Sequence, residues 1–127
     1  MKKAYSTKSA PEAIGPYSQA VAAGGFLFIS GQIPLTPEGV LAGATIEDQT
    51  RQVLINLTEI LKSAGLTTDN VVKTTVFLVD MEDFAAMNFV YSTFFPADCP
   101  ARSAVQVGAL PRGVRVEIEA IAASDTL

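Results

Sequence analysis

Apolar residues recur along the chain with two periods, and these predict five strands and two helices. Apolar runs and alternations favour strands over residues 17–23, 26–29, 71–79, 103–107 and 114–123. Apolar residues three and four positions apart favour helices over residues 45–64 and 80–95. The order β-β-α-β-α-β-β places helices between strands. It predicts an α+β fold, a mixed sheet with its helices on one face.

Local signals set the expected ends of these elements. Gly24-Gly25 predicts a two-residue hairpin between the first two strands. Thr45 and Asp80 are expected to cap the two helices with their side chains, and Gly65 and Pro96 end them. Each predicted helix therefore has both a start and a stop signal.

The strand over residues 71–79 is apolar on both of its faces. Alternation divides its apolar residues into two sets: Val72, Val76 and Leu78 on one face, and Val71, Phe77 and Val79 on the other. A strand that is apolar on both sides is typical of a sheet between two layers. The helices would form one layer, and a second subunit could form the other.

The composition adds an expectation about assembly. The 127 residues are 49% hydrophobic and 17% charged, against about 25% charged in an ordinary globular domain. We expect a single domain spanning residues 1–127, with too few charged side chains to cover an isolated monomer. Part of its apolar surface is expected to be buried between subunits, and an unusually apolar monomer is the alternative.

Charge and cysteine content count against several classes of function. Nine basic and 13 acidic residues give a net charge of −4, which offers no basic footprint for nucleic acid. Cys99 is the only cysteine, so no intrachain disulfide can form, and a reducing, cytoplasmic setting is expected. No apolar stretch reaches the roughly 20 residues that cross a bilayer. With no His and one Cys, neither a metal nor a cofactor is expected.

Arg102 is the leading candidate for a binding residue, because the chain offers so few other catalytic groups. A guanidinium presents a rigid fork of donors that matches a carboxylate, so a small carboxylic acid is the expected ligand. Glu117 would come close to Arg102 if the last two strands pair as a hairpin. Glu119 points to the same face as Glu117 and is expected to be solvated.

Four further residues carry polar groups that a ligand could use. Asn88 falls on the apolar stripe of its helix, where it either joins a site or ties down a neighbouring loop. Ser30 and Gly31 follow an apolar strand, and the Gly31 N–H could donate to a ligand; a plain turn is the alternative. Tyr17 follows Gly15-Pro16 and is either a site residue or a packed surface aromatic.

These residues lie within a series of short motifs that spans nearly the whole chain. The motifs are Ile14–Ala20 (IGPYSQA), Ser30–Pro34 (SGQIP), Val72–Leu78 (VKTTVFL), Asn88, Pro100–Ser103 (PARS) and Val116–Ala120 (VEIEA). In this order and at these spacings the series resembles the Rid family, also called the YjgF family. More narrowly, it resembles the RidA subfamily of 2-iminobutanoate/2-iminopropanoate deaminases.

The resemblance implies a chorismate-mutase-like fold and a homotrimer, with a central barrel of three sheets and clefts between subunits. It also implies hydrolysis of 2-imino acids and enamines to 2-keto acids and ammonia, without a cofactor. Two alternatives remain open at this point. One is a non-catalytic regulatory trimer that binds a small carboxylate, and the other is a translation-inhibiting ribonuclease.

The resemblance also assigns roles to residues. Arg102 would hold the substrate carboxylate, and Glu117 would activate the attacking water. Gly31 and the backbone at Ala104 would lie along the substrate, and the cleft would be lined by Tyr17, Ser30 and Asn88. Many deaminases of the family carry Cys where this chain has Ala104, so substrate preference could differ if that side chain tunes substrate size.

Overall fold

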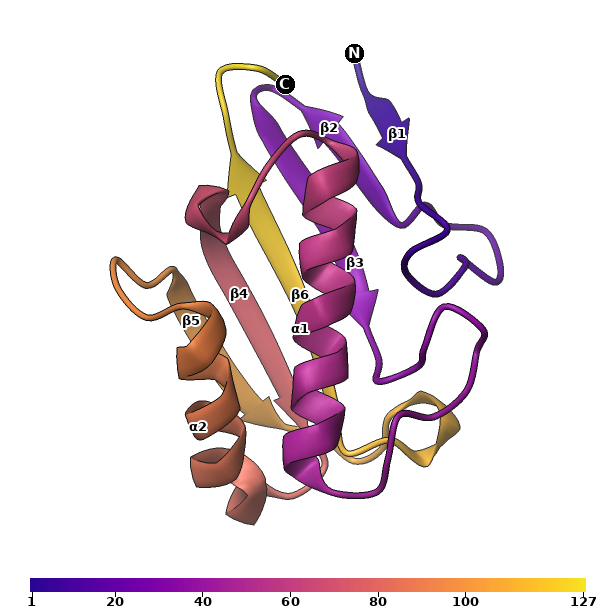
Figure 1. The fold of residues 1–127 in the computed structure, drawn as a ribbon, viewed down its shortest axis with the longest axis vertical. Coiled ribbons are helices and arrows are strands. Elements are labelled where there is room, and N and C mark those ends of the chain that lie inside the picture. Colours follow the sequence, from indigo (N-terminus) through magenta and orange to yellow (C-terminus); the bar gives the residue numbers. More distant parts are fainter.

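Six strands form one sheet in this computed structural model, which describes residues 1–127, and two α-helices lie against one face of the sheet (Figure 1). The strands are β1 (Lys3–Tyr5), β2 (Ala20–Ala23), β3 (Phe26–Gln32), β4 (Val71–Leu78), β5 (Ala101–Gln106) and β6 (Val116–Ala123). The helices are α1 (Ile46–Ser63) and α2 (Phe84–Phe94), and the short 3-10 turns are η1 (Thr68–Asn70), η2 (Met81–Asp83) and η3 (Pro111–Gly113). The predicted α+β architecture with helices on one face is confirmed.

The C-terminal strand lies inside the sheet rather than at its edge. The strand order is β1-β2-β3-β6-β4-β5, so β6 separates β3 from β4 and pairs antiparallel with both. β5 pairs parallel with the other edge of β4, reached through the α2 crossover that a parallel pair requires. β5 and β6 therefore do not pair, and the hairpin expected between them is wrong.

Several element ends differ from the prediction for local reasons. β1 was not predicted, because its three residues are largely exposed and show no apolar alternation. β2 starts at Ala20, because the Tyr17 N–H donates to the Gly15 carbonyl (2.9 Å) and residue 17 closes a turn. Thr45 caps α1 as expected, with Oγ1 accepting from the Asp48 N–H at 3.1 Å.

The core lies between the two helices and the sheet face that they cover. The largest side chains with less than 2% exposure come from α1, α2, alternate positions of β3, β4 and β6, and the residue after η3: Leu27, Leu54, Ile60, Leu61, Leu78, Met87, Ile118, Val53, Val76, Val90, Val114 and Val116. Burial of this apolar stripe, rather than helix propensity alone, holds α1 and α2 against the sheet.

A bulge in β4 changes which of its residues face the core. The register shifts between Val71 and Lys73, so Val72 is the extra residue. Val71 and Val76 are both buried, whereas Val72 is 45% exposed. The prediction that Val72 shares a face with Val76 and Leu78 is wrong, because one inserted residue reverses the alternation upstream of it.

The opposite face of the sheet carries no second layer. We call it the open face and define it by four residues whose strand neighbours point into the core: Phe26, Phe28, Phe77 and Val105. Phe26, Phe28 and Val105 are 43%, 46% and 42% exposed, and the rings of Phe26 and Phe28 lie 6.2 Å apart. Exposed large apolar side chains on a sheet face that no other layer covers are typical of an association surface.

Candidate functional site

Arg102 lies on edge strand β5 and points toward helix α2. In the parallel register it is paired with Thr74, whose side chain is fully buried under the helices. Its Nη1 donates to Asn88 Oδ1 at 2.7 Å. The guanidinium carbon lies 4.8 Å from the ring centroid of Tyr91 and 5.4 Å from that of Phe84. Arg102 and Asn88, both candidate site residues, are therefore hydrogen-bonded to each other, and two aromatic rings lie against the guanidinium.

The Arg102 guanidinium has no carboxylate partner. The chain's ion pairs involve Arg51, Lys62 and Arg115, and none reaches Arg102. A cavity of about 440 Å³ opens beside it, lined by Asn88, Tyr91, Ser92, Phe95, Cys99, Pro100 and Arg102. An amide and π faces orient a guanidinium without cancelling its charge, so its remaining donors are available to an external anion.

Arg115 shows the contrasting case of a cation used to hold the fold together. Its Nε and Nη2 donate to the two carboxylate oxygens of Asp83 at 3.1 and 2.9 Å, and its Nη1 donates to the Ala44 carbonyl at 3.2 Å. Asp83 is only 8% exposed. This bidentate pair joins the start of β6 to the start of α2, and it leaves Arg115 little capacity for a ligand.

Glu117 lies on β6, beside Phe77 in the register with β4, and it points to the open face. A register shift in β3 between Ile29 and Gln32 brings the backbone of Gly31 against its carboxyl group. A Cβ atom at Gly31 would overlap the Glu117 carboxylate, only 2.9 Å from its Cδ atom. A side chain at position 31 would displace the end of the Glu117 side chain, so glycine lets the backbone and this carboxylate approach each other.

Ser30 completes this second group of polar residues. Its hydroxyl donates to the Ser18 carbonyl at 2.6 Å, and its N–H donates to the Gln19 carbonyl at 2.9 Å. These bonds tie the end of β3 to the loop that carries Tyr17. Of the two predicted candidates, Gly31 lies against Glu117, and Ser30 precedes it in the chain.

Burial raises the pKa of Glu117, and the nearby Glu119 carboxylate raises that pKa further. Both effects disfavour the charged form, so the carboxylate holds a proton more readily than a solvated glutamate. A carboxylate with a raised pKa is a better proton acceptor, which is the property that a general base requires.

Arg102 and Glu117 do not meet within one chain. They flank β4 on different edges, and Arg102 points to the helix side whereas Glu117 points to the open face. The expectation that a β5–β6 hairpin brings them together is wrong, because β4 lies between the two strands. Ala104 shares the helix-side orientation of Arg102, two residues along the same edge strand.

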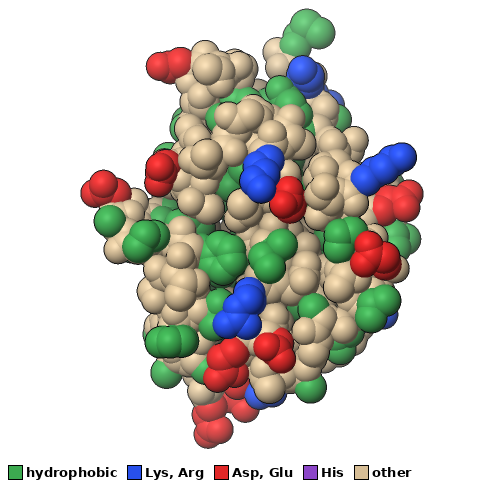
Figure 2. Space-filling view, viewed as in Figure 1, with side chains coloured by type: hydrophobic (Ala, Val, Ile, Leu, Met, Phe, Trp, Pro, Cys, Tyr) green, Lys and Arg blue, Asp and Glu red, His purple; other side chains and the backbone are tan.

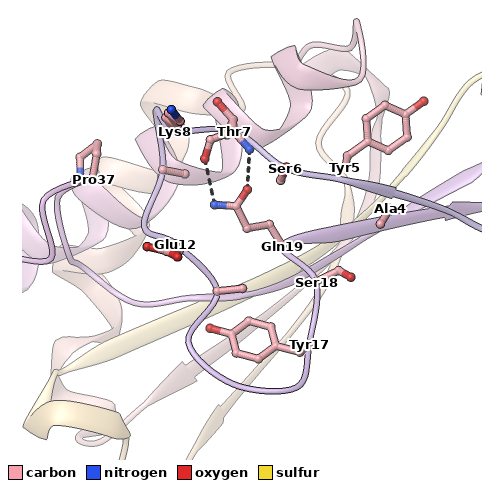
Figure 3. Close-up of a pocket in the computed structure, with 12 residues that line it drawn as sticks. Ala4, Tyr5, Ser6, Thr7, Lys8, Glu12, Tyr17, Ser18, Gln19 and Pro37 are labelled. Carbon is pink, nitrogen blue, oxygen red and sulfur yellow. Dashed lines mark hydrogen bonds between the residues drawn. The ribbon is translucent and has the colours of Figure 1, made fainter.

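Tyr17 lies at a separate cavity formed by the N-terminal loop. This cavity, of about 800 Å³, is lined mainly by residues 4–19. Figure 3 shows how buried Gln19 holds the loop: its Oε1 accepts from the Thr7 N–H (2.7 Å), and its Nε2 donates to the Thr7 carbonyl (3.1 Å). The cavity is larger than the one at Arg102 but includes neither Arg102 nor Glu117, so we place the chemistry at the charged groups instead.

Sequence reasoning missed three residues around Arg102. Thr74, Tyr91 and Phe84 contact it or support its contacts. Tyr91 and Phe84 belong to the apolar pattern that predicts a helix over residues 80–95, and that pattern does not mark them as site residues. Thr74 carried a usable signal, since it places a hydroxyl on the otherwise apolar, core-facing side of its strand.

The surface, the side-chain clusters and the helices add three observations. On the helix side of the molecule, acidic and basic side chains are interspersed with apolar ones (Figure 2). No group of three or more His, Cys, Asp or Glu side chains lies close enough together to hold a metal ion. No helix is long and apolar enough to cross a bilayer.

Comparison with known proteins places this architecture. The family model described as Endoribonuclease L-PSP matches residues 7–124. A 2-iminobutanoate/2-iminopropanoate deaminase of Mus musculus is 54% identical over 123 residues, which cover 96% of this chain and 91% of the mouse protein. Among solved structures, an endoribonuclease-like protein of Thermotoga maritima has a TM-score of 0.95 at 52% identity, covering 98% and 99% of the two chains. E. coli TdcF with bound serine has a TM-score of 0.92 at 46% identity, covering 96% and 99%.

The fold therefore defines a class of small α+β proteins in which two helices cover one face of a six-stranded mixed sheet. Within that class, the chain belongs to the Rid/YjgF family, the L-PSP family of the matching model. Relatives named for an activity are 2-iminobutanoate/2-iminopropanoate deaminases.

Proposed function

We propose that this protein hydrolyses 2-imino acids, such as 2-iminopropanoate and 2-iminobutanoate, and their enamine tautomers to 2-keto acids and ammonia. The observation that carries the proposal is the Arg102 guanidinium, which lies in a cavity without a carboxylate partner. The 54% identity to a mouse protein of that named activity supports the reaction class. Serine bound to TdcF, a relative at 46% identity, supports a small carboxylate as ligand.

We propose that the complete site forms between subunits of a homotrimer. Arg102 and Glu117 lie on opposite faces of one sheet, so a site that uses both needs a second chain. The uncovered apolar open face supplies a surface for association. Family resemblance supports three subunits whose sheets form a central barrel, with a cleft at each of the three interfaces.

In this site Arg102 would hold the substrate carboxylate by two parallel hydrogen bonds and so place the adjacent C=N carbon. Glu117 of the partner subunit would take a proton from a water molecule as the water oxygen adds to that carbon. That proton would pass to the imine nitrogen, which gives a carbinolamine. Glu117 would then take the carbinolamine hydroxyl proton and deliver it to the same nitrogen, so that the C–N bond breaks as the C=O bond forms and ammonia leaves. An enamine would first be protonated at C3 to give the imine.

The remaining predicted residues would shape the cleft. Gly31 would let both the substrate and the Glu117 carboxylate approach its backbone, and the backbone at Ala104 would lie along the substrate. Tyr17, Ser30 and Asn88 would line the walls, with Asn88 also orienting Arg102 through its 2.7 Å hydrogen bond. No step in this scheme requires a metal or an organic cofactor.

A turnover assay tests the proposal. 2-Iminopropanoate is generated in situ from alanine with an amino-acid oxidase, and its decay is followed with and without the protein. The protein should accelerate decay, and Arg102→Ala should lower kcat/KM by about 100-fold, since it loses two charge-assisted hydrogen bonds. Arg51→Ala, on the exposed side of α1, is the matched control. An unchanged spontaneous rate with the wild-type protein would contradict the proposal.

A non-catalytic carboxylate-binding trimer is the second candidate, and it rests on the same cavity at Arg102. Calorimetry with 2-ketobutyrate should detect binding under either function, so only turnover separates them. A ribonuclease, as the description of the matching family suggests, is disfavoured by the net charge of −4 and the absence of histidine. RNA cleavage by highly purified protein that is lost in Arg102→Ala would support a ribonuclease function.

A cytoplasmic location remains a prediction from the single cysteine.

A further inference from the structure

The aromatic ring nearest to Arg102 is itself fixed to the sheet. The Tyr91 hydroxyl lies 2.7 Å from Thr74 Oγ1, and both side chains are buried, at 6% and 0% exposure. On its other side the Tyr91 ring packs against Phe95, with centroids 4.7 Å apart and planes inclined by 39°. Tyr91 is therefore held at its hydroxyl by a hydrogen bond and along its ring by an aromatic contact.

Thr74, which holds Tyr91 by its hydrogen bond, is a neighbour of Arg102 in the sheet. Thr74 on β4 is paired in register with Arg102 on β5, and both point toward α2, which carries Tyr91 and Asn88. The Thr74–Tyr91 hydrogen bond therefore ties α2 to β4 directly beside Arg102. It sets the position of the ring on which the guanidinium lies.

All the groups that hold Arg102 are neutral, and this property matters for an anion site. Burial raises the pKa of Tyr91, against the opposing effects of the Thr74 hydrogen bond and the Arg102 charge, so the phenol stays uncharged. A carboxylate in the same place would neutralise the guanidinium, as Asp83 does for Arg115. A ring face attracts the cation and still leaves its charge for a ligand.

We propose that Thr74 and Tyr91 are positioning residues for substrate binding: the Thr74 hydroxyl fixes the Tyr91 ring, and the ring holds the Arg102 guanidinium in the orientation that receives the substrate carboxylate. The inference rests on the proposed function for its substrate. Its structural part, the dependence of Arg102 on Thr74, holds independently of turnover.

The kinetic test compares Thr74→Val with Thr74→Ser and Tyr91→Phe. Thr74→Val and Tyr91→Phe each remove the hydrogen bond between Thr74 and Tyr91, and Thr74→Ser keeps a hydroxyl that can form it. Ordering a rotamer-rich side chain at the moment of binding costs about two- to tenfold in affinity. We expect KM for 2-iminopropanoate and the Kd of 2-ketobutyrate to rise by about that factor in the first two variants and to recover in Thr74→Ser.

A purely structural role gives a different result. Loss of folded protein lowers the apparent kcat in proportion and leaves KM unchanged. The matched control is Thr50→Val, which removes a fully buried hydroxyl that has no hydrogen-bond partner, away from Arg102. It should leave KM at the wild-type value.

A second readout needs no substrate. The NMR signal of the Arg102 Nε–H proton can be assigned by its loss in Arg102→Lys. It should be shifted upfield in the ligand-free wild-type protein, because the guanidinium lies over two rings. In Thr74→Val it should move toward the position of a solvated arginine, and in Thr74→Ser it should return.

The outcomes separate the two claims. Wild-type KM and an unmoved Nε–H signal in Thr74→Val would overturn the inference while the proposed function stands. If the wild-type protein neither turns over the imine nor binds 2-ketobutyrate, the proposed function fails. The NMR signal then decides alone whether Thr74 positions Arg102.

Discussion

Arg102 and Glu117 point away from opposite faces of one sheet, with strand β4 between the strands that carry them. Each is surrounded by its own group of residues: Arg102 by Asn88 and Tyr91, and Glu117 by Gly31. A site that needs both groups must combine one face of one subunit with the other face of its neighbour. This geometry leads directly to a complementation experiment.

Mixing two inactive variants should restore activity. The trimers are reassembled from equal amounts of Arg102→Ala and Glu117→Gln chains. About three quarters of them contain both kinds of chain, and in each of these one of the three interfaces carries both native residues. About one quarter of all sites should therefore be active. Activity is measured after joint denaturation and refolding. Each variant refolded alone is the control, and no recovery in the mixture would place both residues outside a shared intersubunit site.

Gly31→Ala should impair the Glu117 group. The new methyl group would overlap the Glu117 carboxylate, and the end of this flexible side chain must change rotamer, at a cost of about 0.5–1.5 kcal/mol in the free energy of unfolding. Turnover should fall with it. Gly108→Ala is the control, since a Cβ atom there meets no atom within 4 Å. Denaturant unfolding and imine decay measure the two effects, and equal behaviour of the two variants would contradict the close approach.

The raised pKa of Glu117 predicts the pH dependence of both activity and stability. Activity should fall as acidification protonates Glu117, and Glu119→Gln, which removes the neighbouring charge, should move this fall to lower pH. Because the folded state disfavours ionised Glu117, its contribution to stability is present below the ordinary carboxyl pKa and is lost as pH rises through the raised pKa. Glu117→Gln should therefore raise Tm at pH 7 but not at pH 3. A Tm gain at pH 3 as large as at pH 7 would contradict the shift.

Ligand binding should be weakened less by removal of the Asn88 side chain than by a negative charge at this position. Its Oδ1 accepts from Arg102 at 2.7 Å, so Asn88→Asp would place a carboxylate against the guanidinium and compete with the ligand. We expect 2-ketobutyrate binding to weaken by about threefold in Asn88→Ala and by more than about tenfold in Asn88→Asp. Calorimetry measures both, and the reverse ranking would argue against an anion at Arg102.

Two buried threonines should respond oppositely to the same substitution. The Thr50 hydroxyl has no partner, so Thr50→Val should raise the free energy of unfolding by about 1 kcal/mol. Thr74→Val leaves the Tyr91 hydroxyl without its hydrogen-bond partner and should lower the free energy of unfolding by about 1–3 kcal/mol. Urea unfolding compares them, and a shared sign would show that the two hydroxyls have equivalent surroundings.

Much of the site chemistry could be predicted from the sequence. A chain without histidine leaves Arg102 as the residue to bind an acid, and Asn88 stood out as a polar residue on an apolar stripe. The structure pairs these two residues. Glu117 was singled out as an acid on an apolar strand, but its relation to Arg102 was wrong, since proximity in sequence suggested a hairpin that β4 prevents.

The sequence by itself determined α1 with its N-cap at Thr45, the body of α2 and most strands, because periodicity and caps act over a few residues. The expected start of the second helix was wrong, since Asp80 caps η2 and α2 begins at Phe84. Only the tertiary structure decided that β6 enters the sheet between β3 and β4, that the bulge at Val72 reverses a face, and that Thr74 anchors Tyr91 beside Arg102. Strand order and register are set by contacts between residues far apart in the chain, which local patterns do not encode.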